Sequence, residues 1–217
     1  MPQTAHRHTA SLTLDVALPY LLHVPDGAAP AGGWPLVLFL HGSGERGHDP
    51  EMLRLQGLPK RLDDGLAFPA LVLSPQCPEG DVWPQHFPAL LHLIDTVAAR
   101  YGADLDRVVA TGLSLGGAGT VHLVAAHPER FAALAPICGP WTWYYANAAM
   151  ARLPLWVFHG SADQVVSVAD SRRLVARVRE LGGAPRYTEY PGIGHDAWTP
   201  AYADPEVLDW LLDPRRS

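Results

Sequence analysis

The sequence has few residues that could bind polyanions. Lys60 is its single lysine, and its 16 lysines and arginines are outnumbered by 22 aspartates and glutamates, which gives a net charge of −6. A chain with this balance offers no positive field to phosphate groups. We therefore expect no nucleic-acid partner.

Cysteine and long apolar runs are also scarce. Cys77 and Cys138 are the only two cysteines, and no apolar run approaches the roughly 18 residues that span a bilayer. The polar, histidine-bearing start MPQTAHRHTASLTLD does not resemble a signal peptide. We expect free thiols, a cytoplasmic location and no membrane partner. Whether the two thiols lie close in space is left open.

The composition is that of a folded protein rich in turns. Of 217 residues, 48% are hydrophobic and 18% charged, with 21 prolines and 20 glycines, which excludes a disordered chain. Two full domains would each be unusually small. We expect a single domain over residues 1–217, with its core at about 11–212.

Short apolar segments alternate with longer helical patterns along the chain. This alternation predicts the α/β class: a mainly parallel central sheet with helices on both faces. An antiparallel pair is expected at the start, from residues 11–17 and 19–24, because apolar residues alternate there. The buried strands are expected at residues 36–40, 71–74, 108–111, 132–137, 155–158 and 186–190. The helices are expected at residues 87–101, 117–127, 168–181 and about 205–212.

Residues 112–116 read G-L-S-L-G, the G-x-S-x-G pattern of a nucleophile elbow. An apolar segment precedes the pattern and a helical one follows, which gives the strand, turn and helix that the elbow needs. Ser114 would then sit at a strained tip with its hydroxyl exposed, and Gly112 and Gly116 would let strand and helix pass closely. The helix N-terminus adds partial positive charge for a developing oxyanion.

A serine hydroxyl needs a base, and the base needs an orienting acid. His195 lies in a glycine-flexed loop after the last predicted strand and is the only one of 11 histidines beyond residue 159. Asp163 follows another strand on a tight loop, where a triad acid belongs. Asp170 is expected near the start of a helix and Glu189 inside a strand. We therefore predict Ser114, Asp163 and His195 as the catalytic residues.

The glycine-rich segment HGSGERG leaves the first buried strand. A second oxyanion donor comes from this position in serine hydrolases of such architecture. We predict the backbone N–H groups of Ser43 and Leu115 as the oxyanion hole. His41 is expected to brace the loop, and Glu45 and Arg46 are either a local ion pair or solvated charges.

Together the motifs HGSGERG, SPQCPEGDVW, GLSLGG, HGSAD and GIGHDAW resemble compact bacterial α/β-hydrolase esterases. The resemblance spans about residues 18–212 and is to the phospholipase/carboxylesterase, feruloyl esterase and polyhydroxybutyrate depolymerase groups. It implies an α/β-hydrolase fold with little or no cap domain and cleavage of carboxylic esters without a cofactor. It also implies Ser114 as nucleophile, Asp163 as acid and His195 as base, with Ser43 and Leu115 at the oxyanion hole.

Other functions remain open. A serine peptidase or a lactone hydrolase would use the same triad, since the triad specifies acyl transfer and not the leaving group. A non-catalytic hydrolase-like binding protein is the alternative from another class. We expect no metal site, because His6 with His8 and His41 with His48 form no ligand spacing typical of one.

Aromatic residues suggest the substrate pocket. In this architecture a cap usually enters before the penultimate strand, where only residues 138–154 are available, so we expect an open cleft. That connection carries Trp141 and Tyr144, and Trp83 and Trp198 belong to two other loops at the same sheet edge. We predict these four as substrate-binding residues for a small short-chain or aryl ester. The physiological substrate is left open, as is the choice between monomer and homodimer.

Overall fold

The computed structural model describes residues 4–10, 13 and 15–214. Within this part of the chain, seven strands form one sheet in the order β1-β3-β2-β4-β5-β6-β7. The strands are β1 (Tyr20–His23), β2 (Trp34–Leu40), β3 (Leu71–Pro75), β4 (Ala103–Leu113), β5 (Ala133–Ile137), β6 (Trp156–Gly160) and β7 (Arg186–Tyr190). All neighbouring pairs are parallel except β1 with β3.

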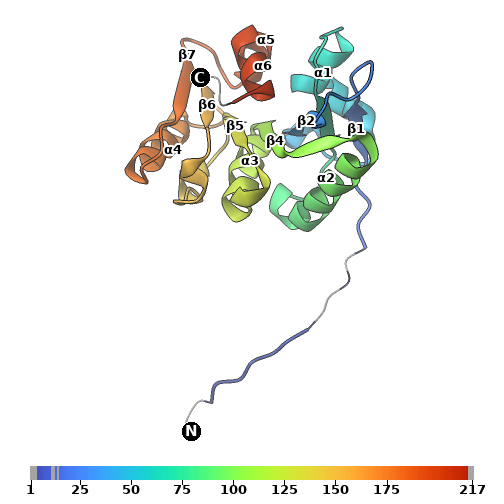
Figure 1. Ribbon diagram of the computed structural model, residues 1–217. Coiled ribbons are helices and arrows are strands. Elements are labelled where there is room, and N and C mark those ends of the chain that lie inside the picture. Colours follow the sequence, from blue (N-terminus) through green and yellow to red (C-terminus); the bar gives the residue numbers. More distant parts are fainter. Residues whose placement is uncertain (1–3, 11–12, 14, 215–217) are drawn as a thin grey trace.

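Helices cover both faces of this sheet, which confirms the predicted α/β class. They are α1 (Gly57–Asp63), α2 (Phe87–Tyr101), α3 (Leu115–Ala126), α4 (Val168–Glu180), α5 (Trp198–Ala203) and α6 (Pro205–Leu212). Figure 1 shows α2, α3 and α4 on one side of the sheet and α1, α5 and α6 on the other. The predicted second, third and last helices agree with α3, α4 and α6 to within two residues, and the first with α2.

The sheet is apolar on both faces because each face packs on its own layer of helices. In β2, Leu36, Leu38 and Leu40 belong to the core under α2, α3 and α4. Val37 and Phe39, which alternate with them, belong to the core under α1, α5 and α6. A strand buried on both faces carries a continuous apolar run, which is why this segment is recognisable in the sequence.

The predicted antiparallel pair at the start is wrong in its partner. Ser11, Leu12 and Leu14 lie outside the described residues, and residues 13 and 15–19 form no strand. β1 pairs instead with β3, with Leu21 opposite Ser74 and Leu22 opposite Leu73. The apolar alternation at residues 11–17 is a local pattern, whereas β3 offers β1 a sheet edge whose backbone groups need partners.

Cys77 and Cys138 are both buried free thiols, as expected. None of the helices in residues 4–10, 13 and 15–214 combines the length and apolar character that crossing a bilayer requires.

Candidate active site

Ser114 occupies a sharp turn between β4 and α3. β4 ends at Leu113 and α3 begins at Leu115, and Ser114 between them has φ 52° and ψ −116°. A non-glycine residue adopts such a backbone only where the surroundings impose it, and this strain is typical of functional sites. Its N–H donates to the Ile137 carbonyl on β5 at 2.9 Å, which holds the turn against the sheet.

The glycines on either side of Ser114 are required by close backbone contact. A Cβ on Gly112 would stand 2.5 Å from the Leu40 carbonyl oxygen and 2.6 Å from that of Gly116. A Cβ on Gly116 would overlap the same Leu40 carbonyl. The turn therefore brings the end of β4 and the start of α3 directly against the end of β2, as predicted for an elbow.

His195 reaches Ser114 from the loop that follows β7. Its Nε2 lies 2.9 Å from the Ser114 Oγ. The loop is fixed through the His195 carbonyl, which accepts from the Ala197 N–H at 2.8 Å and from the Cys138 thiol at 3.5 Å. The imidazole also packs edge-to-face against the indole of Trp198, with ring centroids 5.3 Å apart.

Asp163 completes the arrangement, three residues beyond the end of β6. Its Oδ2 lies 2.7 Å from the His195 Nδ1, and its Oδ1 accepts from the N–H groups of Val165 and Val166 at 2.8 and 2.9 Å. Burial opposes the charged form, but hydrogen bonds from His195 and these two amides lower the pKa of the carboxyl below its ordinary value. Asp163 is thus held as a carboxylate.

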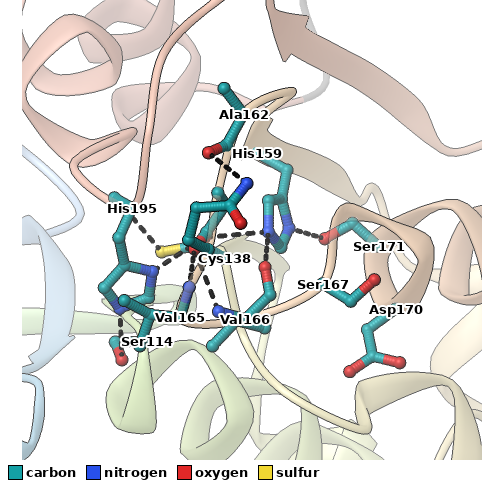
Figure 2. Close-up of polar contacts among 12 residues, drawn as sticks. Ser114, Cys138, His159, Ala162, Val165, Val166, Ser167, Asp170, Ser171 and His195 are labelled. Atoms are coloured by element: carbon teal, nitrogen blue, oxygen red, sulfur yellow. Dashed lines mark hydrogen bonds and ion pairs between the residues drawn. The ribbon is translucent and has the colours of Figure 1, made fainter.

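The three side chains form one directed chain of hydrogen bonds, of which Figure 2 shows the link between Ser114 and His195. Because the His195 Nδ1 faces a carboxylate, this nitrogen carries the proton, and Nε2 is free to accept from the Ser114 hydroxyl. Residues from three separate loops meet here because the parallel strands β4, β6 and β7 all end at the same edge of the sheet. The structure brings together the three residues predicted as catalytic.

A second histidine, for which the sequence predicts no role, also contacts Asp163. His159, on β6, has its Nε2 3.1 Å from the Asp163 Oδ2, and both side chains are fully buried. The signal available in the sequence is its place in HGSAD, four residues before Asp163.

The glycine-rich loop after β2 lies beside the Ser114 turn. Ser43 starts a short 3₁₀ helix, η1 (Ser43–Glu45), and a Cβ on Gly42 would stand 2.8 Å from the Leu113 Cδ1. Leu115 is the first residue of α3, so its N–H is among the helix donors without an intrahelical acceptor. This placement is compatible with the predicted oxyanion hole, whose donors stay a prediction.

His41 braces this loop, as expected. Its Nδ1–H donates to the Gly42 carbonyl at 2.6 Å, and its Nε2 accepts from the Cys77 N–H at 2.9 Å. Burial lowers the pKa of the imidazole from 6.5 to about 4, so the ring is neutral near pH 7. Trp83 completes the brace by donating its indole N–H to the His41 carbonyl at 3.1 Å.

Glu45 and Arg46 form neither of the arrangements considered from the sequence. Burial raises the pKa of the Glu45 carboxyl, whose Oε2 lies 3.8 Å from the His41 Nδ1. Arg46 turns the other way and donates to the carbonyls of Ser43 and Asp81, both at 3.1 Å. Arg46 therefore ties the loop to the segment of Asp81, whereas the Glu45 Oε2 is buried without a hydrogen-bond partner.

The predicted aromatic pocket needs one correction. Trp83 is 0% exposed, because its indole packs into the core against α3, where Gly119 leaves room for it. It supports the loop of His41 and does not line an open pocket. Trp141 and Tyr144, in contrast, are 70% and 74% exposed, and Trp198 contacts His195. Their part in substrate binding stays a prediction.

One group of side chains among the described residues has metal-ligand character. Ligand atoms of Cys138, Asp163 and His195 lie within 4.8 Å of one another. The carboxylate and the imidazole are already hydrogen-bonded to each other at 2.7 Å, and burial raises the pKa of the Cys138 thiol far above its ordinary value. A thiol binds metal as the thiolate, and burial of Cys138 disfavours that form. Asp163 and His195 are instead bound to each other as members of the triad.

Comparisons with known proteins agree with this geometry. The model of the family "Esterase: Putative esterase" matches residues 11–199. A bifunctional acetylxylan esterase/xylanase, XynS20E, of Neocallimastix patriciarum is 27% identical over 78% of this chain. A poly(3-hydroxyoctanoate) depolymerase of Pseudomonas fluorescens is 28% identical over 88% of this chain and 78% of its own length.

Solved structures show the same fold. The crystal structure of a thermostable esterase is 34% identical, with a TM-score of 0.76 over 89% of this chain. A ferulic acid esterase structure, at 16% identity, has a TM-score of 0.69. These likenesses confirm the α/β-hydrolase fold. The chain spans 26% of the length of XynS20E and 58% of the thermostable esterase chain.

Proposed function

This chain belongs to the esterase family whose model covers residues 11–199, and we propose that it is a serine hydrolase of carboxylic esters, of short-chain or aryl type, acting through an acyl-enzyme on Ser114. The observation that carries the proposal is the continuous hydrogen-bond chain from Ser114 through His195 to Asp163. The names of its relatives, an acetylxylan esterase and a polyester depolymerase, support cleavage of carboxylic esters.

The geometry supports a two-stage mechanism. The Ser114 Oγ attacks the acyl carbonyl carbon while its proton passes to the His195 Nε2, which lies 2.9 Å away. Asp163 stabilises the resulting imidazolium through Nδ1–H. The imidazolium then gives its proton to the leaving oxygen as the carbon–oxygen bond of the ester breaks. Water then attacks the acyl-enzyme with the same proton transfers through His195, which releases the acid and free Ser114.

Negative charge on the carbonyl oxygen needs fixed donors while the intermediate exists. We assign this role to the N–H groups of Ser43 and Leu115, at the starts of η1 and α3. Main-chain donors held by neighbouring structure need no reorganisation as charge develops. The neutral His41 brace keeps the loop in place without adding a charge.

The size of the substrate follows from the connection between β5 and β6. This connection contains only two short 3₁₀ helices, η5 (Thr142–Tyr144) and η6 (Met150–Arg152), and no cap domain. We propose that Trp141, Tyr144 and Trp198 bind the acyl or alcohol group of a small ester at an open cleft. We also propose action in the cytoplasm, for which the two buried free thiols are the supporting observation. We propose a monomer or a homodimer as the oligomeric state.

Turnover of matched substrates tests the reaction class. Purified protein is given p-nitrophenyl acetate, the corresponding p-nitroanilide and an aryl lactone. We expect the highest kcat/KM on the ester. A higher kcat/KM on the anilide would instead favour a serine peptidase, and a higher value on the lactone a lactone hydrolase. No turnover of any of the three would favour a binding protein.

A further inference from the structure

His159 contacts Asp163 within the core of the protein. It is the fourth residue of β6, and its side chain and that of Asp163 are both 0% exposed. Its Nε2 lies 3.0 Å from the Val166 carbonyl oxygen and 3.1 Å from the Asp163 Oδ2. Its Nδ1 lies 2.7 Å from the Ser171 Oγ on α4, as Figure 2 shows.

The partners of His159 fix the position of its proton. Both atoms that face Nε2 are acceptors only, a carbonyl and a carboxylate, so Nε2 carries hydrogen. The Ser171 hydroxyl can donate to Nδ1, which satisfies a neutral ring. His159 is thus a buried donor to the Val166 carbonyl, and its Nε2 also lies 3.1 Å from the same Oδ2 that accepts from the His195 Nδ1.

We propose that His159 is a positioning residue for the triad. Its Nε2–H binds the Val166 carbonyl and so holds the segment whose amides bind Asp163. Its Nε2 also lies against the Oδ2 of Asp163, and the two contacts together fix the orientation and the charge that this carboxylate presents. The proposal rests on the proposed function of the triad. Asp163 is then held from each direction: two amides donate to Oδ1, His195 donates to Oδ2 from the cleft, and His159 contacts Oδ2 from the core.

Sharing the carboxylate has a kinetic consequence. A carboxylate that lies beside the polar N–H group of His159 attracts the His195 proton less strongly. Asp163 therefore stabilises the protonated His195 ring less than it would without the His159 contact. Loss of the His159 donor shifts the acid limb of kcat/KM to higher pH and leaves the carboxylate less well oriented.

Other charged groups around this pair are held by their own partners. Glu189 on β7 stands opposite His159 in the sheet register and is bound by Arg172 and Tyr187. Asp170 on α4 accepts from the Trp141 N–H. Asp196, next to His195, accepts from Thr199. The remaining titratable neighbour is the buried Cys138 thiol, which is directed at the His195 carbonyl.

Two substitutions at His159 separate positioning from packing. His159→Leu removes the donor, whereas His159→Gln keeps an N–H near the position of Nε2. For His159→Leu we expect a fall in kcat of about tenfold, by analogy with partners that orient metal ligands. We expect its acid limb to move up by about 0.5 pH unit, because the polar contact with the carboxylate is lost. His159→Gln restores both.

Thr111→Val is the matched control. Its hydroxyl is equally buried, on β4, and bonds to the Ala135 carbonyl and Tyr202 without touching Asp163. It should lower the melting temperature and leave the acid limb in place. If His159→Leu does not fold, Ser171→Ala takes its place, with a smaller upward shift expected because the His159 Nε2–H becomes a weaker donor.

An unmoved acid limb in the variant that folds, or a shift that His159→Gln does not reverse, would overturn the proposal. The proton NMR titration of the His195 ring, in a Ser114→Ala background, gives the same answer without ester cleavage. A protein that hydrolyses no ester but shows the shifted titration in His159→Leu would refute the proposed function and retain the role of His159. A protein that hydrolyses esters but shows no shifted titration in His159→Leu would retain the proposed function and refute the role of His159.

Discussion

Gly116 lies so close to the end of β2 that a Cβ on it would overlap the carbonyl oxygen of Leu40. This contact fixes where α3 begins relative to the loop of His41 and Ser43. This one contact between two backbone segments therefore positions both the nucleophile turn and the loop with the predicted oxyanion donor. Strain at Ser114, with φ 52°, is maintained by the same packing.

Gly116→Ala should consequently destabilise the protein by about 2 kcal/mol or more, because backbone atoms cannot yield as a flexible side chain would. The matched control is Gly44→Ala, whose Cβ would meet nothing within 4 Å, and it should change stability by less than about 1 kcal/mol. Urea unfolding of both variants measures this. Equal stabilities would show that the contact does not constrain the turn.

The acid of the triad is tested by two aspartates only seven positions apart. Asp163→Asn should lower kcat by roughly 10⁴, because the imidazole loses the partner that holds its tautomer and stabilises its charged form. Asp170→Asn should leave most of kcat, because Asp170 accepts from the Trp141 N–H and not from His195. Steady-state kinetics on p-nitrophenyl acetate compares them, and the opposite ranking would move the acid to Asp170.

His41 gives the protein a pH-dependent stability. Burial lowers the pKa of its imidazole from 6.5 to about 4, so between these values the unfolded chain binds a proton that the folded chain does not. Stability is therefore complete above pH 6.5 and falls as the pH drops towards 4, by roughly 3 kcal/mol at one pKa unit per 1.36 kcal/mol. Urea unfolding at pH 7 and 4.5 should show a smaller loss for His41→Gln than for the unaltered protein. Equal losses of stability in the two proteins would show that His41 is not the cause of the pH dependence.

Substrate length tests the open cleft. The short connection between β5 and β6 carries no cap, so the enzyme should need no activation at a lipid interface. In a p-nitrophenyl ester series from acetate to palmitate, kcat/KM should be highest for short chains and fall sharply for long ones. A maximum at dodecanoate or longer, or a jump in rate above the micelle concentration, would be incompatible with the open cleft.

The sequence predicted what depends on local pattern. The Ser114 turn is encoded within residues 112–116, and the strands of the sheet interior are continuous apolar runs. Asp163 and His195 were predictable because each follows a strand of a parallel sheet, and such strands end at one edge. That reasoning places loops together without resolving individual side chains.

Contacts that depend on packing between distant segments were not predictable. The indole of Trp83 is buried because Gly119 on α3 makes room for it, which the loop position of Trp83 does not reveal. The role of His159 depends on Ser171 on α4 reaching its far nitrogen. β1 pairs with β3 across some 50 residues, while the local alternation at residues 11–17 suggested a nearer partner.

Covalent labelling of Ser114 tests the central claim most directly. A fluorophosphonate probe is added to the unaltered protein and to Ser114→Ala, followed by intact mass measurement, peptide mapping and assay of p-nitrophenyl acetate turnover. We expect one adduct, on Ser114, that abolishes turnover, and no adduct in Ser114→Ala, whose kcat falls by on the order of 10⁴ or more. An adduct on another residue, or near-normal turnover by Ser114→Ala, would contradict the account.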